Sequence, residues 1–287
     1  MINKLVIFGV GLIGGSCALA LREAGAVREI VGVGRSWENL SAALGTYVID
    51  QAATDTASAL QGADVVLLAV PMGQMGGIMA QIAPHLEAHT IVTDVGSTKQ
   101  DVVSIACLHL GSNLSRFVPG HPIAGAEQSG VKAARGDLFK GKRVVLTPLP
   151  ETDAAAVEAV KSMWRTCGAE VTEMAPQAHD AIFAAVSHLP HLLAFALVDE
   201  VASRANGDEL FQYAASGFRD FTRIAGSSPE MWRDICLANR EALLGELDAY
   251  QARLALLRTW LAAGDGAALE ASFARARAAR VARLGGS

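Results

Sequence analysis

Residues 5–15 read Leu-Val-Ile-Phe-Gly-Val-Gly-Leu-Ile-Gly-Gly, an apolar run that leads into the pattern Gly-x-Gly-x-x-Gly. In a strand–turn–helix unit, the first glycine permits the tight turn, the second lets the backbone approach a pyrophosphate, and the third lets the helix pack closely on the strand. The N-terminus of the following helix adds free N–H groups and a partial positive charge. The stretch therefore predicts a dinucleotide site formed by Gly9, Gly11, Leu12, Ile13 and Gly14.

The sequence around this motif alternates apolar runs with amphipathic stretches. Runs rich in Val and Ile lie at residues 5–9, 30–33, 65–70 and 91–95, with helix-like segments at residues 13–24, 37–44, 74–83 and 100–108. Further strand candidates at residues 117–118, 143–148 and 170–173 accompany a helical stretch at residues 154–167. Continuous apolar runs are typical of strands buried on both faces of a parallel sheet. The alternation predicts an α/β fold of the doubly wound Rossmann type.

The pattern changes after about residue 175. Strand signals end, and segments rich in Ala and Leu with helical periodicity follow at residues 179–203, 209–224, 230–262 and 267–283. We therefore predict a nucleotide-binding domain over residues 1–174 and an all-α domain over residues 175–287. Apolar residues lie on several faces of these helices, which favours burial against a second copy and hence a homodimer formed through the helical domain.

Composition narrows the classes of partner. Of the 287 residues, 51% are hydrophobic and 18% are charged, as in a globular protein, and the net charge of -5 disfavours nucleic acid, which needs clustered Lys and Arg. We see no signal peptide and no apolar run of the roughly 18 residues that span a membrane. The four cysteines have no zinc-site spacing, which favours buried thiols in a reducing compartment. We expect a cytoplasmic protein without a metal.

The end of the second predicted strand bears on the choice of cofactor. NAD enzymes usually place an Asp or Glu there, which bonds the ribose 2′-hydroxyl. This strand instead ends in Gly34-Arg35-Ser36. A carboxylate would repel a 2′-phosphate, whereas Arg35 can pair with it and Ser36 can hydrogen-bond it. The pattern favours NADP over NAD; alternatively, Arg35 lies in solvent and either cofactor is used.

Three stretches should meet beyond the carboxyl ends of the strands, where ligands of such sheets bind. Val70 and Pro71 close one strand and should line the cofactor cleft, Ser97 follows the next strand, and His121 follows the short strand at residues 117–118. Ser97 is either a helix cap or part of the site. His121, between a glycine and a proline in a predicted loop, suits a general base, because its ordinary pKa is near neutral; a buried structural histidine is the alternative.

The helical half carries two further motifs. In Ser-His188-Leu-Pro190-His191, the proline suggests a functional kink, and two histidines without a nearby carboxylate make a poor metal site. Arg219 and Arg223 lie four residues apart, as on one helix face. Arg223 is either a carboxylate clamp that projects into the cleft or a surface residue paired with an acid.

Five stretches, taken together and in this order, strongly resemble the prephenate/arogenate dehydrogenases of tyrosine biosynthesis. They are GVGLIGGS, DVGSTK, GHPIAGAEQSG, SHLPH and GFRDFTRIAGSSPEMWRDI, and the similarity runs from residue 5 to about residue 239. The resemblance implies an NAD(P)-dependent oxidoreductase that oxidatively decarboxylates prephenate, arogenate or both, giving 4-hydroxyphenylpyruvate or tyrosine. Hydride leaves the ring carbon that bears the 4-hydroxyl, and loss of CO2 makes the ring aromatic.

The resemblance also implies residue roles and a dimer built from the helical domain. His121 matches the catalytic histidine that takes the hydroxyl proton, and Ser97 matches the serine that assists it. Arg223 matches the arginine that grips a substrate carboxylate, and His188 matches the active-site histidine of the SHLPH motif. Gly34 stands where many NAD-using members carry an acid, which again favours NADP.

Two alternatives remain open at this point. One is another two-domain dehydrogenase, of the β-hydroxyacid dehydrogenase or pyrroline-carboxylate reductase type. A catalytic Lys in the second domain would mark such enzymes, and no Lys occurs from residue 175 onward. The other is an NADP-binding regulator that has lost its chemistry, against which the presence of Ser97, His121 and Arg223 counts.

Overall fold

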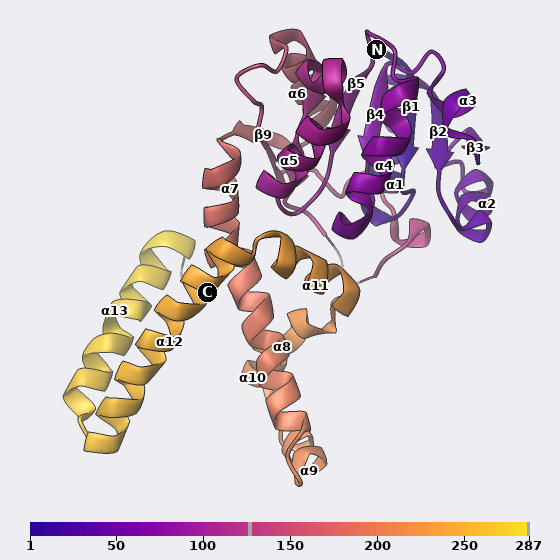
Figure 1. Ribbon diagram of the computed structural model, residues 1–287. Coiled ribbons are helices and arrows are strands. Elements are labelled where there is room, and N and C mark those ends of the chain that lie inside the picture. Colours follow the sequence, from indigo (N-terminus) through magenta and orange to yellow (C-terminus); the bar gives the residue numbers. More distant parts are fainter. Residues whose placement is uncertain (126–127, 286–287) are drawn as a thin grey trace. The chain divides into compact units, whose positions relative to one another are not determined.

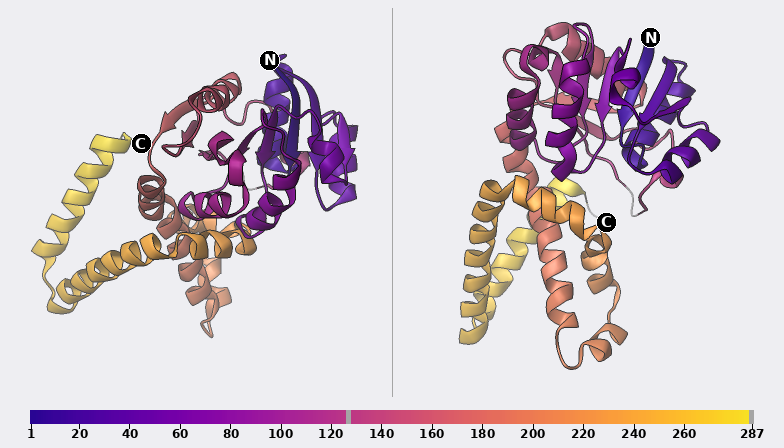
Figure 2. Two further views of the ribbon diagram at one scale, coloured as in Figure 1. Left: turned by 45° about the horizontal axis from the view of Figure 1, so that its top comes forward. Right: turned by 45° about the vertical axis from the view of Figure 1, so that its right-hand side comes forward.

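The computed structural model describes residues 1–125 and 128–285 (Figures 1 and 2). These residues form two compact units, Met1–Arg240 and Glu241–Ser287. The first unit contains both sheets and the helices up to residue 240, and the second consists of two long helices. The domain boundary expected near residue 174 stays a prediction.

A six-stranded sheet with the order β3-β2-β1-β4-β5-β6 forms the centre of the first unit (Figure 1). All of its neighbouring strands pair in parallel. The strand order reverses between β1 and β4, and ligands of doubly wound sheets bind at such a switch point, beyond the carboxyl ends of the strands. The predicted α/β fold is confirmed. The strands are β1 (Ile2–Phe8), β2 (Val27–Val33), β3 (Gln51–Ala53), β4 (Val65–Leu68), β5 (Ile91–Asp94) and β6 (Phe117–Val118).

The strands of this sheet are apolar without interruption because both of its faces are covered. In β1, Leu5 and Ile7 pack into one core cluster while Val6 and Phe8 pack into the other. Side chains alternate along a strand, so both sets need an apolar layer. The first cluster includes residues of α1 (Leu12–Glu23), α2 (Trp37–Gly45) and α6 (Ala154–Thr166), and the second includes residues of α3 (Thr56–Leu60), α4 (Met75–Ile82) and α5 (Gln100–His109). Short one-turn helices connect several of these elements: η1 (Met72–Gln74), η2 (Ala83–His85), η3 (Gly111–Arg116) and η4 (Val131–Ala133).

A second, three-stranded sheet has the order β7-β8-β9. It consists of β7 (Gly120–Pro122), β8 (Arg143–Leu146) and β9 (Glu170–Glu173). The expectation that His121 lies in a loop was wrong, because His121 is the middle residue of β7 and pairs antiparallel with Val145 of β8. This pairing holds the backbone of His121 against β8, which a loop would not do.

The helices that follow are more broken than predicted. The expected helix at residues 209–224 is α9 (Gly207–Gln212), α10 (Ser216–Thr222) and a turn, η6 (Arg223–Gly226), so Arg219 and Arg223 do not share one α-helix. The expected helix at residues 230–262 divides at Asn239 into α11 (Pro229–Ala238) and α12 (Arg240–Ala263). In the second unit, α13 (Gly266–Leu284) follows α12.

One helical run, Pro176–Ala202, is long and apolar enough to cross a membrane by length and composition, with a hydropathy of 1.9 and 28% of its most apolar window buried. The expectation that no apolar run reaches this length was therefore wrong. A helix in a protein interior passes the same test, so the finding carries little weight by itself. The run consists of α7 (Pro176–Phe183), a π-helical turn, η5 (Ala184–His188), and α8 (Leu189–Ala202). Pro190 lies at the start of α8, directly after the π turn.

Candidate active site

The glycine turn forms the floor of a cleft at the carboxyl ends of β1 and β4. Gly9 has a φ of +92°, and a Cβ there would lie 2.3 Å from the Ala69 carbonyl oxygen. A Cβ on Gly14 would lie 2.5 Å from the Gly9 oxygen, whereas a Cβ on Gly11 would meet nothing within 4 Å. Gly9 and Gly14 are thus required by packing. Gly11 leaves open space beside the N-terminus of α1, where a phosphate group can approach the backbone.

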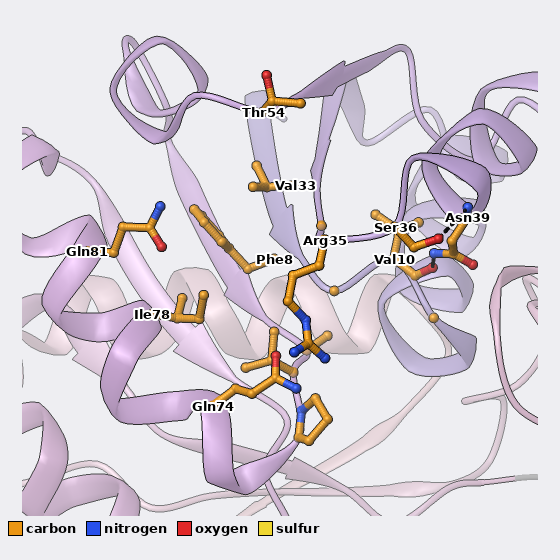
Figure 3. Close-up of a pocket in the computed structure, with 16 residues that line it drawn as sticks. Phe8, Val10, Val33, Arg35, Ser36, Asn39, Thr54, Gln74, Ile78 and Gln81 are labelled. Carbon is orange, nitrogen blue, oxygen red and sulfur yellow. Dashed lines mark hydrogen bonds between the residues drawn. The ribbon is translucent and has the colours of Figure 1, made fainter.

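A cavity of about 700 Å³ opens beside this turn (Figure 3). Gly9 and Gly11 line it from the turn, Val70 and Pro71 line it from the end of β4, and Arg35 and Ser36 line it from the end of β2. Leu12 and Ile13 do not line it; both are partly buried and pack against the core. The structure therefore gathers the predicted cofactor residues around one cavity, except for Leu12, Ile13 and Gly14, which shape the turn and helix behind it.

The cavity suits a nicotinamide dinucleotide in size and in chemistry. Its volume lies in the range of cofactor sites, and the N-terminus of α1 adds the partial positive charge that favours a pyrophosphate. Arg35 extends into the cavity toward Gln74 (Figure 3). The side chain of Ser36 accepts a hydrogen bond from the Asn39 amide at 3.2 Å, so Ser36 also caps α2. Among the described residues that line the cavity, none is an Asp or Glu.

Direct contacts lead from this cavity to His121. Met72 follows Pro71, and a Cβ on Gly96 would lie 2.7 Å from its sulfur. Asp94, at the end of β5, accepts hydrogen bonds from the amide of Gly96 at 2.7 Å and from that of Gly120 at 3.0 Å. The residue after Gly120 is His121. His121 belongs to β7 of the three-stranded sheet. Asp94, at the end of β5, joins this strand to the carboxyl-end edge of the six-stranded sheet, where the cofactor cavity lies.

Lys99 holds the backbone of Gly120, the residue before His121. Its ammonium group is buried, pairs with the Asp94 carboxylate and donates to the Gly120 carbonyl oxygen at 2.7 Å. A buried ion pair is stable only when its remaining hydrogen bonds are satisfied, and here the backbone amides of Gly96 and Gly120 satisfy those of Asp94. The pair orients the start of β7.

His121 is joined to two buried residues of α7. His121 Nδ1 lies 2.9 Å from His179 Nε2, and His179 Nδ1 lies 2.7 Å from Asp180 Oδ1. The rings of His121 and Phe183 meet edge to face at a centroid distance of 5.0 Å. Burial lowers the pKa of His121 well below its ordinary value, and His179, Lys99 and His188 act in the same direction. The imidazole is therefore neutral at physiological pH and able to accept a proton.

His188 lies in the same buried cluster, but no hydrogen bond joins it to His121 in the described part of the chain. Its Nδ1 accepts a hydrogen bond from Asn239 Nδ2 at 3.0 Å, and the same amide donates to the Asp180 carbonyl oxygen at 2.8 Å. Its Nε2 is buried without a hydrogen-bond partner among the described residues. Burial is the main cause that lowers the pKa of His188 to about 4, while the negative charge of Asp180 and, to a smaller extent, the backbone of nearby Ser97 act in the opposite direction.

Ser97 lies in the loop between β5 and α5, near His188, and is partly buried. The structure shows no hydrogen bond between its side chain and His121, so its assisting role stays a prediction. The helix-cap alternative finds no support either, because Lys99 precedes α5 and no side chain caps it.

Arg223 opens the turn η6 and is exposed. Burial is the main cause that lowers the pKa of His191, and the positive charge of Arg223 contributes. The His191 ring stacks on Trp232 with centroids 3.7 Å apart. Arg223, His191 and Trp232 thus gather in one cluster beside the SHLPH motif. Two residues of the GHPIAGAEQSG motif, Ala126 and Glu127, lie outside the described residues.

Sequence reasoning missed the groups that surround His121. His179, Asp180 and Asn239 were assigned no role, and Lys99 was quoted only as part of a motif. A neighbouring His-Asp pair in the first two turns of an otherwise apolar helix was the available signal, because such groups are seldom buried without a partner.

Comparisons with known proteins bear on both halves of the chain. A family model described as prephenate dehydrogenase, nucleotide-binding domain, matches residues 17–173, and one described as prephenate dehydrogenase, dimerization domain, matches residues 175–275. A prephenate dehydrogenase of Bacillus subtilis is 40% identical over 267 residues, 92% of this chain and 72% of that protein. A cyclohexadienyl dehydrogenase of Zymomonas mobilis is 35% identical over 282 residues, 98% of this chain and 96% of that protein.

A solved structure is similar over nearly the whole length of the chain. The crystal structure of prephenate dehydrogenase from Aquifex aeolicus, in complex with hydroxyphenyl propionate and NAD+, has a TM-score of 0.92 and 37% sequence identity. The alignment covers 98% of this chain and 98% of that chain.

Proposed function

This chain belongs to the prephenate dehydrogenase family, and from that premise we propose that it is a nicotinamide-dependent dehydrogenase that oxidatively decarboxylates prephenate, arogenate or both. The observation that carries the proposal is the position of His121. A neutral, partly exposed imidazole stands at the strand ends next to a cavity fit for a dinucleotide. The β-hydroxyacid dehydrogenase and silent-regulator alternatives are not favoured by this combination.

In this reaction the protein has to orient the substrate toward the cofactor and to accept one proton. When bound, the nicotinamide cofactor supplies the hydride acceptor. The substrate carbon that bears the hydroxyl gives up hydride while His121 Nε2 accepts the hydroxyl proton, so that a carbonyl forms in the ring. Breaking the bond to the ring carboxylate then releases CO2 and returns its electron pair to the ring. Aromatisation makes this second step strongly favourable.

The cluster of Arg223, His191 and Trp232 is proposed as the end of the site that receives the substrate's acidic groups. A guanidinium recognises a carboxylate with two parallel hydrogen bonds. Arg223 also lies close enough to His191 to affect its pKa. His188, three residues before His191 on the helical run Pro176–Ala202, contributes a buried Nε2. Ser97 is proposed to form a hydrogen bond with the substrate hydroxyl.

We further propose that the enzyme prefers NADP and works as a homodimer in the cytoplasm. The preference is supported by Arg35 and Ser36 at the cavity and by the lack of an acid among its described lining residues. The dimer is supported by the match of residues 175–275 to a dimerization domain and by the exposed apolar side chains of the helical run, such as Ile182 and Val186.

Initial rates with prephenate and with arogenate, each combined with NAD and with NADP, test the proposal. We expect reduced cofactor to form with at least one of the two substrates, accompanied by CO2 and an aromatic product, and faster at low cofactor concentration with NADP. The His121→Asn variant should bind the cofactor normally and lose turnover by about 100-fold or more, the range for a general base. If neither substrate reduces either cofactor, the proposed function is wrong.

A further inference from the structure

Two buried side chains behind His121 have no role in the reaction described above. His179 and Asp180 both lie in α7 and are inaccessible to solvent, and they continue the hydrogen-bond chain that starts at His121 Nδ1. Burying an imidazole and a carboxylate is costly unless both are satisfied. The details of their hydrogen bonds determine where each proton in the chain lies.

The Asp180 carboxylate is ionised and accepts all of its hydrogen bonds. Oδ1 accepts from the Lys99 amide at 2.8 Å, and Oδ2 accepts from the Gln100 amide at 2.9 Å. Burial alone would raise the pKa of Asp180, but its hydrogen bonds with His179 and these two amides hold the pKa below its ordinary value. The contact between Oδ1 and His179 Nδ1 at 2.7 Å must therefore be an N–H that His179 donates.

This assignment fixes the remaining protons. A neutral His179 that carries its proton on Nδ1 has a lone pair on Nε2, so the 2.9 Å contact requires His121 Nδ1 to donate. His121 then has its lone pair on Nε2, the nitrogen for which the described residues provide no hydrogen bond. The carboxylate thus selects the tautomer that a proton acceptor needs, through one intervening imidazole.

We propose that His179 and Asp180 are positioning residues that hold His121 in its Nδ1–H tautomer and share the positive charge that His121 acquires when it takes the substrate's proton. This inference rests on the proposed function for its catalytic part. As the substrate O–H bond breaks, a new N–H bond forms at His121 Nε2. The proton on His121 Nδ1 then moves toward His179 Nε2, and Asp180 balances the resulting imidazolium. The hydride leaves separately to the nicotinamide, so the relay carries a proton and no net electrons.

The surrounding charges explain why such a relay is useful. His121 is partly buried and faces His179, Lys99 and His188, all of which disfavour a positive imidazole. His179 additionally faces Asp94, which acts in the opposite direction, as does its hydrogen bond with Asp180. The nearby Asp101 is also affected by Asp180. Within this cluster, Asp180 is the carboxylate in line with the two imidazoles, whereas Asp94 is already paired with Lys99.

A purely structural role is the competing explanation, because Asp180 also accepts from the first amides of α5 and so joins α7 to α5. Substitutions at His179 separate the two roles, since His179 makes no contact with those amides. His179→Phe keeps the ring volume but removes the acceptor for His121 Nδ1. His179→Gln places an amide near the position of Nε2, which can accept a hydrogen bond but cannot take a proton. His89→Gln, at an exposed histidine outside the site, is the matched control.

The first measurement needs no turnover. Nitrogen-15 NMR of histidine-labelled protein reports the tautomer of each ring, and the His121 signal is identified by its loss in His121→Asn. We expect the Nδ1–H tautomer for His121 in the unaltered protein and in His89→Gln, and a mixture of tautomers in His179→Phe. An Nε2–H tautomer in the unaltered protein, or no change in His179→Phe, would overturn the positioning role.

The second measurement is the pH dependence of kcat. We expect His179→Phe and Asp180→Asn to lower kcat by about 100-fold with little change in KM or in cofactor affinity, and His179→Gln to recover part of the loss. In Asp180→Asn the acid limb of the profile should move to lower pH, because the imidazoles lose a balancing negative charge. Unchanged kcat and an unmoved limb in the His179 and Asp180 variants, in an enzyme that His121→Asn inactivates, would refute the relay alone. An unaltered protein that turns over neither substrate would refute the proposed function, and the NMR result would still decide the tautomer.

Discussion

We propose that the Arg35 side chain decides the choice between NAD and NADP. It follows β2 directly and extends into the cavity, next to Ser36, where a ribose 2′-substituent would lie in a doubly wound fold. A guanidinium can form an ion pair with hydrogen bonds to a 2′-phosphate, whereas a neutral 2′-hydroxyl offers only a weaker hydrogen bond.

Arg35→Ala should therefore weaken NADP selectively. The loss of one charge-assisted hydrogen bond costs about 1.5–3 kcal/mol, which corresponds to about a 10- to 150-fold rise in the Kd for NADP. The Kd for NAD should change little. Fluorescence titration with the two cofactors checks this, and Lys4→Ala, on the amino-terminal strand end away from the cavity, serves as the control. Equal losses for both cofactors would contradict the assignment.

For single residues, the sequence predicted those that belong to continuous motifs. It missed those whose role depends on contacts between residues far apart in the sequence. His121 and the glycines could be found because each stands in a short, recognisable stretch. The partnership of His121 with His179 could not, because 58 positions separate them and only the packing of α7 beside β7 brings their rings together. Arg223 was placed on the wrong kind of element, since α10 ends one residue before it.

Among the elements, the helical run from α7 through η5 to α8 carries most of the site. His179, Asp180, His188 and His191 all lie on it, and the π turn at Ala184–His188 precedes Pro190. Because proline has no N–H and its ring crowds the preceding turn, a local widening of the helix accommodates it. The same turn places His188 in the interior, where its pKa falls to about 4, mainly through burial.

This burial predicts how stability changes with pH. His188 titrates at about 4 in the folded chain and near 6.5 in the unfolded chain, so the unfolded state binds more protons between these values. The free energy of unfolding should therefore fall as the pH drops from about 6.5 to about 4, by about 3 kcal/mol for this residue alone. His121, His179 and His191, whose pKa values are also lowered, act in the same direction.

Urea unfolding across this pH range, compared between the unaltered protein and His188→Gln, measures the effect. The variant should show a shallower pH dependence, and only the slopes are compared, because the substitution also changes packing. Asp180, whose pKa is lowered, loses its stabilising contribution only at still lower pH and does not confound the comparison. Identical slopes would show that His188 is not held neutral by burial.

The elements that the sequence predicted well are the long or fully buried ones. The apolar runs of β1, β2, β4 and β5 and the helices α1 and α6 appear within a few residues of their expected ends. The missed elements are short: β3, at the edge of the sheet, has three residues, and α3 has five. The strand around His121 was also missed, because β7 is defined by its pairing with β8 rather than by its composition.

For the whole molecule, the proposed reaction requires a cofactor, a proton acceptor and an acid-binding group to meet around one substrate. The strands provide the first two, because β1, β2 and β4 end at the cavity and β7, whose middle residue is His121, lies beside the end of β5. The helical elements of the first unit carry the proposed relay and the cluster of Arg223, His191 and Trp232, which is proposed to bind the acidic groups. Family membership, with an alignment over 98% of a solved relative, makes this arrangement the expected one.

Prephenate that carries deuterium on the ring carbon bearing the hydroxyl tests whether hydride transfer, proton transfer to His121 and decarboxylation belong to one reaction. With NADP or NAD, we expect the deuterium to appear on the reduced nicotinamide and one CO2 to be released for each deuteride transferred. We also expect His121→Asn to slow both events together. Reduction of the cofactor without transfer of the label, or CO2 release that continues at full rate in His121→Asn, would contradict the proposed reaction.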